Sequence, residues 1–217
     1  MKIDFVSDVS CPWCAIALNS LEAALARVSP SIESELHFQP FELNPQMGAG
    51  GEDVIEHLSG KYGSSPAEME RAQQMIRARG AEVGFTFDMQ KRTRIYNTFD
   101  AHRLLHWAGL EGKQRALKHA LFAAYFTDGR DPSDHGVLVE LASAVGLDAT
   151  RAREILGSDE YAAQVRAAER SYQERGINAV PAVILNDRFL VQGGQPVQVF
   201  EEVLRRVAAG TAGGTSS

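Results

Sequence analysis

Two cysteines are the residues of this sequence best suited to carry chemistry. Cys11 and Cys14 are the only cysteines among 217 residues, and they lie between the apolar run 3–6 and the periodic stretch 15–28. This position predicts a strand-to-helix junction, where a spacing of three puts both sulfurs on one helical face. Unpaired N–H groups and the helix dipole favour a thiolate at that end of a helix. We therefore predict Cys11 as the attacking sulfur and Cys14 as the resolving sulfur.

Three other interpretations compete with redox chemistry at this pair. A zinc site needs four ligands, and no second cysteine pair or nearby Cys/His pair follows in the sequence, so no metal is expected. A structural disulfide closing so short a loop would constrain the unfolded chain very little. Inert buried thiols are the third possibility, although their placement at a strand-to-helix junction favours the redox interpretation.

The residues around the cysteines support this interpretation to different degrees. Pro12 suits the first position of a helix, where its missing N–H has no partner to lose. Trp13 is expected on the surface, where it could contact an apolar partner. Asp8 could oppose ionisation of the thiol or relay a proton, and it could equally cap or turn the loop.

Two histidines four residues apart, His102 and His106, have a spacing that can bind metal. No further ligand accompanies them, so one core histidine and one surface histidine is the preferred interpretation.

Composition limits the class of protein and its partners. The hydrophobic content is 44% and the formal net charge is −6, which argues against a nucleic-acid partner. No apolar run approaches the ~18 residues that would cross a membrane. The first five residues lead into a strand without the features of a signal peptide, so a cytoplasmic location is expected. A reductase or isomerase is then favoured over an oxidase, because the cytosol keeps dithiols reduced.

The periodicity predicts two α/β segments around a helical one. The first segment reads β-α-β, and the last is a hairpin turning at Asn186 and Asp187 followed by a helix that starts after Gln195 and Pro196. Between them the pattern is almost wholly helical, with start signals at Ser65 to Glu68 and at Asn97 and Thr98. The polar, glycine-rich residues 210–217 are expected to form a disordered tail.

An ordered set of motifs resembles the DsbA family, and more closely its FrnE-like branch. The motifs are Cys11-Pro12-Trp13-Cys14, Asn97-Thr98-Phe99-Asp100-Ala101-His102-Arg103-Leu104, Ala179-Val180-Pro181-Ala182 and Gly193-Gly194-Gln195-Pro196. The resemblance implies an α/β, thioredoxin-like fold formed by residues 1–45 and 177–209, with a large all-helical insertion over 46–176. It also implies that Pro181 is cis and faces the cysteines, and that the backbone of Val180 pairs with the substrate.

The resemblance leads to a functional hypothesis. Trp13 stands where the periplasmic enzymes carry histidine, which suggests a less oxidising pair. We expect a thiol-disulfide oxidoreductase for protein or peptide disulfides, in which Cys11 and Cys14 react and Trp13, Val180 and Pro181 bind substrate. No organic cofactor is expected, and a reducing partner or a thiol such as glutathione would complete the cycle.

Two alternatives stay open. One is a glutathione-dependent isomerase or transferase of a small aromatic compound, although related enzymes of that kind carry serine where this chain has Cys11. The other is a holdase-like binding module whose cysteines only sense oxidation.

Overall fold

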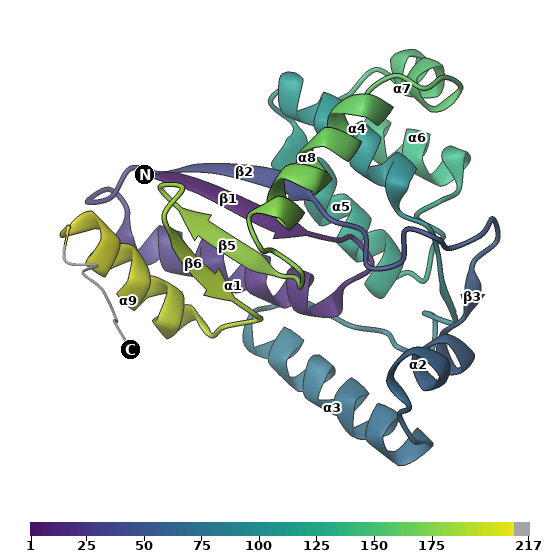
Figure 1. Cartoon of the computed structure of the whole chain (residues 1–217), viewed down its shortest axis with the longest axis horizontal. Helices are drawn as coiled ribbons and strands as arrows, with labels where there is room; N and C mark the ends of the chain where they lie inside the picture. The colour runs from purple at the N-terminus through teal and green to yellow at the C-terminus, as the bar shows by residue number, and fades with distance from the viewer. Residues whose placement is uncertain (211–217) are drawn as a thin grey trace.

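A four-stranded mixed sheet organises the protein. A computed structural model describes residues 1–210, and the predicted tail therefore lies, apart from Gly210, outside the described residues. The strands are arranged in the order β2-β1-β5-β6, with β1 parallel to β2 and antiparallel to β5 (Figure 1). Their bounds are Lys2–Ser7 for β1, Glu35–Pro40 for β2, Ala182–Leu185 for β5 and Phe189–Gln192 for β6. The first and last segments of the chain thus build one sheet, as the thioredoxin-like pattern predicts.

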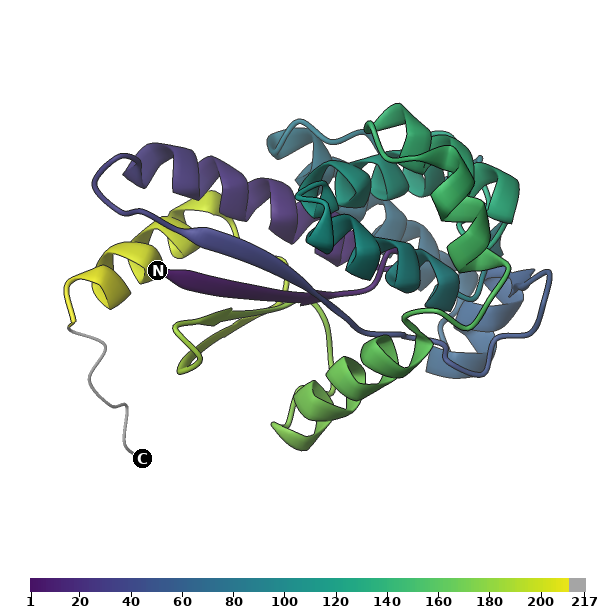
Figure 2. The same ribbon diagram turned by 90° about the horizontal axis from the view of Figure 1, so that it is seen from above.

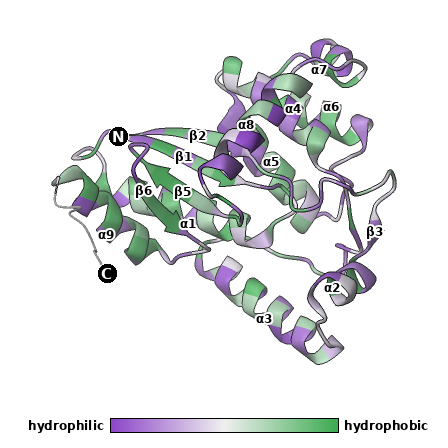
Figure 3. Cartoon of the chain, in the orientation of Figure 1, coloured by the Kyte–Doolittle hydropathy of each residue, from purple (hydrophilic) through white to green (hydrophobic). Residues whose placement is uncertain are grey.

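Helices cover both faces of this sheet. Helices α1 (Pro12–Val28) and α9 (Val197–Ala208) contact each other and lie on one face, while α8 (Ala162–Glu174) lies on the other (Figure 2). Alternation along β1 sends Phe5 into the core beneath α1 and Val6 into the smaller core that includes Tyr172 of α8. Hydrophobic residues are accordingly concentrated in the central strands (Figure 3).

The predicted hairpin between β5 and β6 is confirmed. Its two central residues, Asn186 and Asp187, have φ values of 51° and 56°. Asparagine and aspartate adopt such positive φ more easily than most residues, and two of them in succession match the twist of paired strands. The Nζ of Lys2 lies 2.8 Å from Asp187, which fastens this turn to the start of β1.

Seven helices stand between β2 and β5 within the described residues. Most of α4 to α7 packs around a second apolar core that includes Leu104, Leu117 and Leu138. The bounds of these helices, apart from α8 given above, are Val54–Tyr62 for α2, Pro66–Glu82 for α3, Phe99–Leu110 for α4, Gln114–Phe126 for α5, His135–Ala144 for α6 and Ala149–Leu156 for α7. None of the described helices is long and apolar enough to cross a membrane.

The inserted segment is not helical throughout. A short ladder pairs β3 (Glu52–Asp53) with β4 (Arg94–Ile95), although the sequence predicts only helices there. A strand of two residues is too short to show the alternation of apolar and polar residues from which a strand is predicted. This ladder and the loop over residues 84–93 connect α2 and α3 to the helices that follow, and Arg94 reinforces it by donating to the carbonyls of Gly50 and Gly51.

Candidate active site

The cysteine pair lies where the sequence predicts it, at the junction between β1 and α1. Cys11 is the N-cap residue of α1 with an extended backbone, and Pro12 occupies the first helical position. The N–H groups of Cys14 and Ala15 both donate to the carbonyl of Cys11, which begins the helix. Both cysteines are free thiols. Burial, with the neighbouring Cys11 sulfur, raises the pKa of the Cys14 thiol well above its ordinary value, so Cys14 is the protonated partner at rest.

The loop before β5 faces the first cysteine. The Sγ of Cys11 lies 3.8 Å from the carbonyl oxygen of Val180, and the peptide bond between Val180 and Pro181 is cis. The carbonyl of Pro181 accepts from the N–H of Gly193 at 2.9 Å, which fixes the loop against the chain that follows β6. The cis geometry expected from the family resemblance is therefore confirmed.

Trp13 is half-buried rather than projecting freely from the surface. A Cβ placed on Gly194 would lie 2.8 Å from Cε3 of the Trp13 ring, so the absence of a side chain at Gly194 makes room for the indole. The carbonyl of Gly194 in turn accepts from the guanidinium of Arg79 on α3 at 3.1 Å. The indole thus lies against Gly194, whose carbonyl is tied to α3 by Arg79, and the role of Trp13 in substrate binding stays a prediction.

A cavity of about 340 Å³ opens beside the dithiol. Cys11 itself is only 4% exposed, so a reactant reaches it from this cavity. Residues of the cysteine loop, of the Val180 loop, of the segment after β2, of α2 and α3 with their connection, and of the stretch 89–95 line it: Ser10, Cys11, Pro12, Trp13, Leu43, Asn44, His57, Leu58, Lys61, Tyr62, Ser64, Glu68, Met69, Ala72, Gln73, Ile76, Met89, Arg92, Ile95 and Val180. The sequence predicts the part of the cavity wall that the cysteine and proline motifs form. It does not predict the part that α2 and α3 form.

Asp8 anchors the loop that carries Cys11. Its carboxylate accepts from the N–H and the hydroxyl of Ser10, and from the N–H of Leu43 at 2.7 Å. Burial alone would raise its pKa, but the interaction with His102, aided by those N–H donors, lowers the pKa of Asp8 to about 2. Of the two roles considered for Asp8, the structural one is therefore observed directly.

The two histidines have different environments. His102 is buried, and its Nε2 donates to the carbonyl of Phe41 at 3.0 Å and lies 3.6 Å from Asp8. His106 is half-buried against the ring of Tyr161, with the ring centroids 5.0 Å apart. Within residues 1–210, no group of three or more His, Cys, Asp or Glu side chains is arranged to hold a metal.

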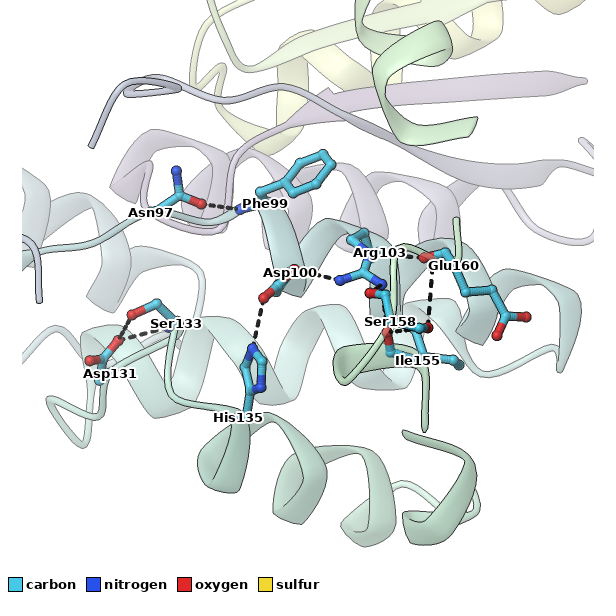
Figure 4. Close-up of polar contacts among 10 residues, drawn as sticks. All are labelled: Asn97, Phe99, Asp100, Arg103, Asp131, Ser133, His135, Ile155, Ser158 and Glu160. Carbon is cyan, nitrogen blue, oxygen red and sulfur yellow. Dashed lines mark hydrogen bonds and ion pairs between the residues drawn. The ribbon is translucent and has the colours of Figure 1, made fainter. Parts of the chain in front are cut away.

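Asn97, Asp100 and Arg103, from the motif that runs from Asn97 to Leu104, make structural polar contacts around α4 (Figure 4). Asn97 caps α4 by accepting from the N–H of Phe99, while the hydroxyl of Thr98 makes no capping bond. The buried guanidinium of Arg103 donates to the carbonyls of Ile155, Ser158 and Glu160 and to Asp100. Asp100 also contacts His135 of α6 at 2.7 Å. His102 connects this motif to the cysteine loop through Asp8, and Ala101 and Leu104 share an apolar core with Val9 of that loop.

Lys118 of α5 is the residue near the dithiol that sequence reasoning misses. It is 1% exposed, and its Nζ lies 5.0 Å from the centroid of the Phe122 ring. It interacts electrostatically with Cys14, Asp8 and Cys11. The available signal is its position: Lys118 lies within the buried stripe that contains Leu117, Leu121 and Phe122, where a lysine is unexpected.

Fold and site together define a thioredoxin-fold protein with a dithiol at a helix N-terminus, facing a cis-proline loop. The profile of the DSBA-like thioredoxin domain matches residues 2–205. The chain belongs to this DsbA-like family, as the resemblance predicts. A comparison with curated proteins found no match to the chain.

Solved structures agree with this assignment. A protein from Streptomyces coelicolor, described as a probable DsbA oxidoreductase, is 34% identical, with a TM-score of 0.91 over 100% of this chain and 93% of that one. Cytosolic disulfide reductase DsbM from Pseudomonas aeruginosa, solved with GSH, is 17% identical (TM-score 0.67; 96% and 100% covered). A 2-hydroxychromene-2-carboxylate isomerase is 16% identical (TM-score 0.72; 98% of both). The last two similarities establish the shared fold.

Proposed function

We propose that this DsbA-like protein is a thiol-disulfide oxidoreductase that reduces or isomerises disulfides of peptides or protein segments. The observation that carries the proposal is the position of Cys11, whose sulfur lies 3.8 Å from the Val180 carbonyl at the wall of the 340 Å³ cavity. An extended segment entering there would place a disulfide against Cys11 and its backbone beside Val180. Trp13 and Val180 would form apolar walls that hold the segment, and Pro181, which is buried, would fix the Val180 loop in place.

The order of the two steps follows from the positions of the two sulfurs, because Cys11 lines the cavity whereas Cys14 is fully buried. The Cys11 thiolate attacks one substrate sulfur, which forms a mixed disulfide and releases the other substrate sulfur as a thiolate. Cys14 then loses its proton and attacks the Cys11 sulfur, so that the Cys11–Cys14 disulfide forms and the second substrate sulfur leaves. The substrate gains two electrons, and the dithiol loses them.

A reducing direction suits the sequence around the dithiol. Trp13 replaces the histidine of the periplasmic enzymes, and a dithiol in the cytoplasm would be kept reduced. We place the protein there, in the FrnE-like branch of the family. A small thiol such as glutathione, or a reducing protein partner, would restore the dithiol without any metal or organic cofactor.

Trapping the mixed disulfide tests the proposal. Cys14→Ser should accumulate a covalent adduct with a disulfide-bonded peptide, because no second sulfur can release it, whereas Cys11→Ser should form none. Mass spectrometry under non-reducing conditions identifies the adduct and its site, and the wild-type protein should yield reduced peptide. Peptide reduction that survives in Cys11→Ser would overturn the proposal.

A small-molecule substrate is the second candidate, and the cover over Cys11 favours it. With 4% of Cys11 exposed and α2 and α3 lining the cavity, a folded protein surface has little access to the sulfur. The cavity volume suits a glutathione-sized or aromatic compound. Glutathione-dependent isomerisation or conjugation that persists in Cys11→Ser would support this candidate, and its absence in wild type and variant alike would exclude it.

A further inference from the structure

The resolving step requires a proton acceptor for Cys14, which thiol-disulfide exchange by itself does not supply. Cys14 is fully buried and carries its proton at rest, because burial raises its pKa. Cys14 belongs to the apolar core that also contains Ile16, Leu18 and Phe122. Before Cys14 can attack, its proton must pass to a group that lies inside this core.

Lys118 carries the buried amine placed to meet that need. Helix α5 packs against α1 (Figure 1), and Lys118 and Cys14 interact electrostatically, so each favours the charged form of the other. Together with Asp8 and Cys11 they form one cluster of four buried ionisable groups at the start of α1. The described core holds no other buried lysine.

The surroundings of Lys118 also provide a path for a proton. It lines a cavity of about 40 Å³ together with His102, His106, Gln39 and Gln114. A cavity of this size and polarity admits a water molecule. The titratable groups that face Lys118 are therefore Cys11 and Cys14 with Asp8 on the dithiol side, and His102 and His106 of α4 on the cavity side.

We infer that the Lys118 amine accepts the proton of Cys14 in the resolving step. The inference rests on the proposed function, since it concerns the second half of that reaction. The Cys14 thiol gives its proton to the neutral amine, and the resulting thiolate attacks the sulfur of Cys11 in the mixed disulfide. The Cys11–Cys14 bond forms, the bond from Cys11 to the substrate sulfur breaks, and the electron pair leaves on the substrate thiolate. The ammonium then releases its proton toward the small cavity.

The ionisation behaviour of this lysine suits the role. Burial lowers the pKa of Lys118 to about 8, with the nearby cysteines and Asp8 opposing the shift. About one tenth of the amine is then neutral at pH 7, far more than in an exposed lysine. The same group becomes a cation once it holds the proton, and that charge stabilises the thiolate as it forms.

An aromatic disulfide whose thiol absorbs light, such as dithiobis(nitrobenzoic acid), separates the two steps in one stopped-flow trace. Attack by Cys11 releases the first aromatic thiol and resolution by Cys14 releases the second. Lys118→Met, which keeps the length and apolar stem of the side chain, should slow the second phase by about a hundredfold near neutral pH. The first phase should slow far less than the second, because Cys11 has the weakest of the three couplings to Lys118, after Cys14 and Asp8.

Controls and pH dependence distinguish this role from simple packing. Lys113→Met, at an exposed position on the N-terminal side of α5, should leave both phases unchanged. In the wild-type protein the second phase should accelerate as pH rises through about 8, and Lys118→Met should lose that inflection. If the second phase is as fast in Lys118→Met as in Lys113→Met, the inference is overturned. If the wild-type trace lacks the first phase, the proposed function is overturned, and the inference with it.

A second measurement avoids the variant altogether. The NMR titration of the Lys118 ε-methylene in the wild-type protein should move to lower pH when the dithiol is oxidised, because the disulfide can no longer carry negative charge. An identical titration in the reduced and oxidised states would show that the lysine and the cysteines are uncoupled, and the inference would fail.

Discussion

The Cys11 sulfur and the Val180 carbonyl oxygen lie 3.8 Å apart although 169 positions separate the two residues. The pairing of β1 with β5 brings them together, since Val6 is opposite Ala182 in the register. A slip of one residue would turn the side chains of β5 to the other face of the sheet and displace the Val180 loop. The site therefore depends on the strand register and not only on the helix that carries the cysteines.

The covering helix α3 should control which disulfides reach Cys11. Ala72→Leu adds bulk at a residue that lines the cavity. It should slow the first attack on a bulky aromatic disulfide by about tenfold, because a misplaced reactant loses rate steeply. The rate with a small aliphatic disulfide should change less, and stopped-flow kinetics with both reagents gives the comparison.

The matched control for this variant lies on the same helix. Ala78 is also exposed on α3 but does not line the cavity, so Ala78→Leu should leave both rates unchanged. Equal slowing by the two variants would show that α3 influences the site through stability rather than access.

The contact between Gly194 and Trp13 should tolerate no added carbon. Gly194→Ala would place a Cβ 2.8 Å from Cε3 of the indole, so the ring must move. Overpacking of this kind costs about 1–3 kcal/mol of the free energy of unfolding, which urea denaturation measures. The indole N–H resonance of Trp13 should shift in the NMR spectrum while that of Trp107, buried in the second core, stays in place. Gly60→Ala, at an open position of α2, is the control, and an unmoved Trp13 resonance in Gly194→Ala would refute the contact.

Local signals in the sequence predict the fold well where they act over a few residues. The capping box of Ser65 and Glu68 begins α3, and Asn186 and Asp187 form the predicted turn. The cysteine pair is equally local, since its chemistry depends on a helix start that proline and the apolar stripe already indicate. The position of the Val180 loop, by contrast, follows from the family resemblance and not from periodicity.

The parts that the sequence does not predict depend on contacts between distant segments. Lys118 is buried because α5 packs on both α1 and α4, and the cavity lining from α2 and α3 depends on how the insertion folds back over Cys11. The β3–β4 ladder joins residues about forty positions apart with two pairs, too few for an alternating pattern. No local propensity encodes these arrangements.

The polar contacts of Arg103 should contribute to stability without taking part in the reaction. Arg103→Met would leave the carbonyls of Ile155, Ser158 and Glu160 without their shared donor. The loss should be about 3 kcal/mol in the free energy of unfolding, because buried acceptors would lose charge-assisted bonds. Urea denaturation measures the loss, with the exposed Arg77→Met as the control, and the first phase of the dithiol reaction should be unchanged in the folded variant. A loss no larger than that of Arg77→Met would contradict this role of Arg103.

Asp8 should make the stability of the protein depend on acid pH. Its pKa in the folded protein is about 2, against an ordinary value of 3.8, so the folded state favours the carboxylate. This contribution is fully present above about pH 4 and is lost as pH falls through about 2. A shift of this size corresponds to roughly 2 kcal/mol in the free energy of unfolding.

Asp8→Asn tests that linkage, because the amide keeps the shape of the carboxylate without its charge. Urea denaturation of both proteins from neutral pH down to about 2 should give a stability difference that is constant above about pH 4 and shrinks below it. Asp128→Asn, at an exposed position, reports the effect of removing one negative charge from the surface. A difference that stays constant across the whole acid range would mean that Asp8 holds the Cys11 loop through hydrogen-bond geometry alone, and that its charge contributes nothing to the fold.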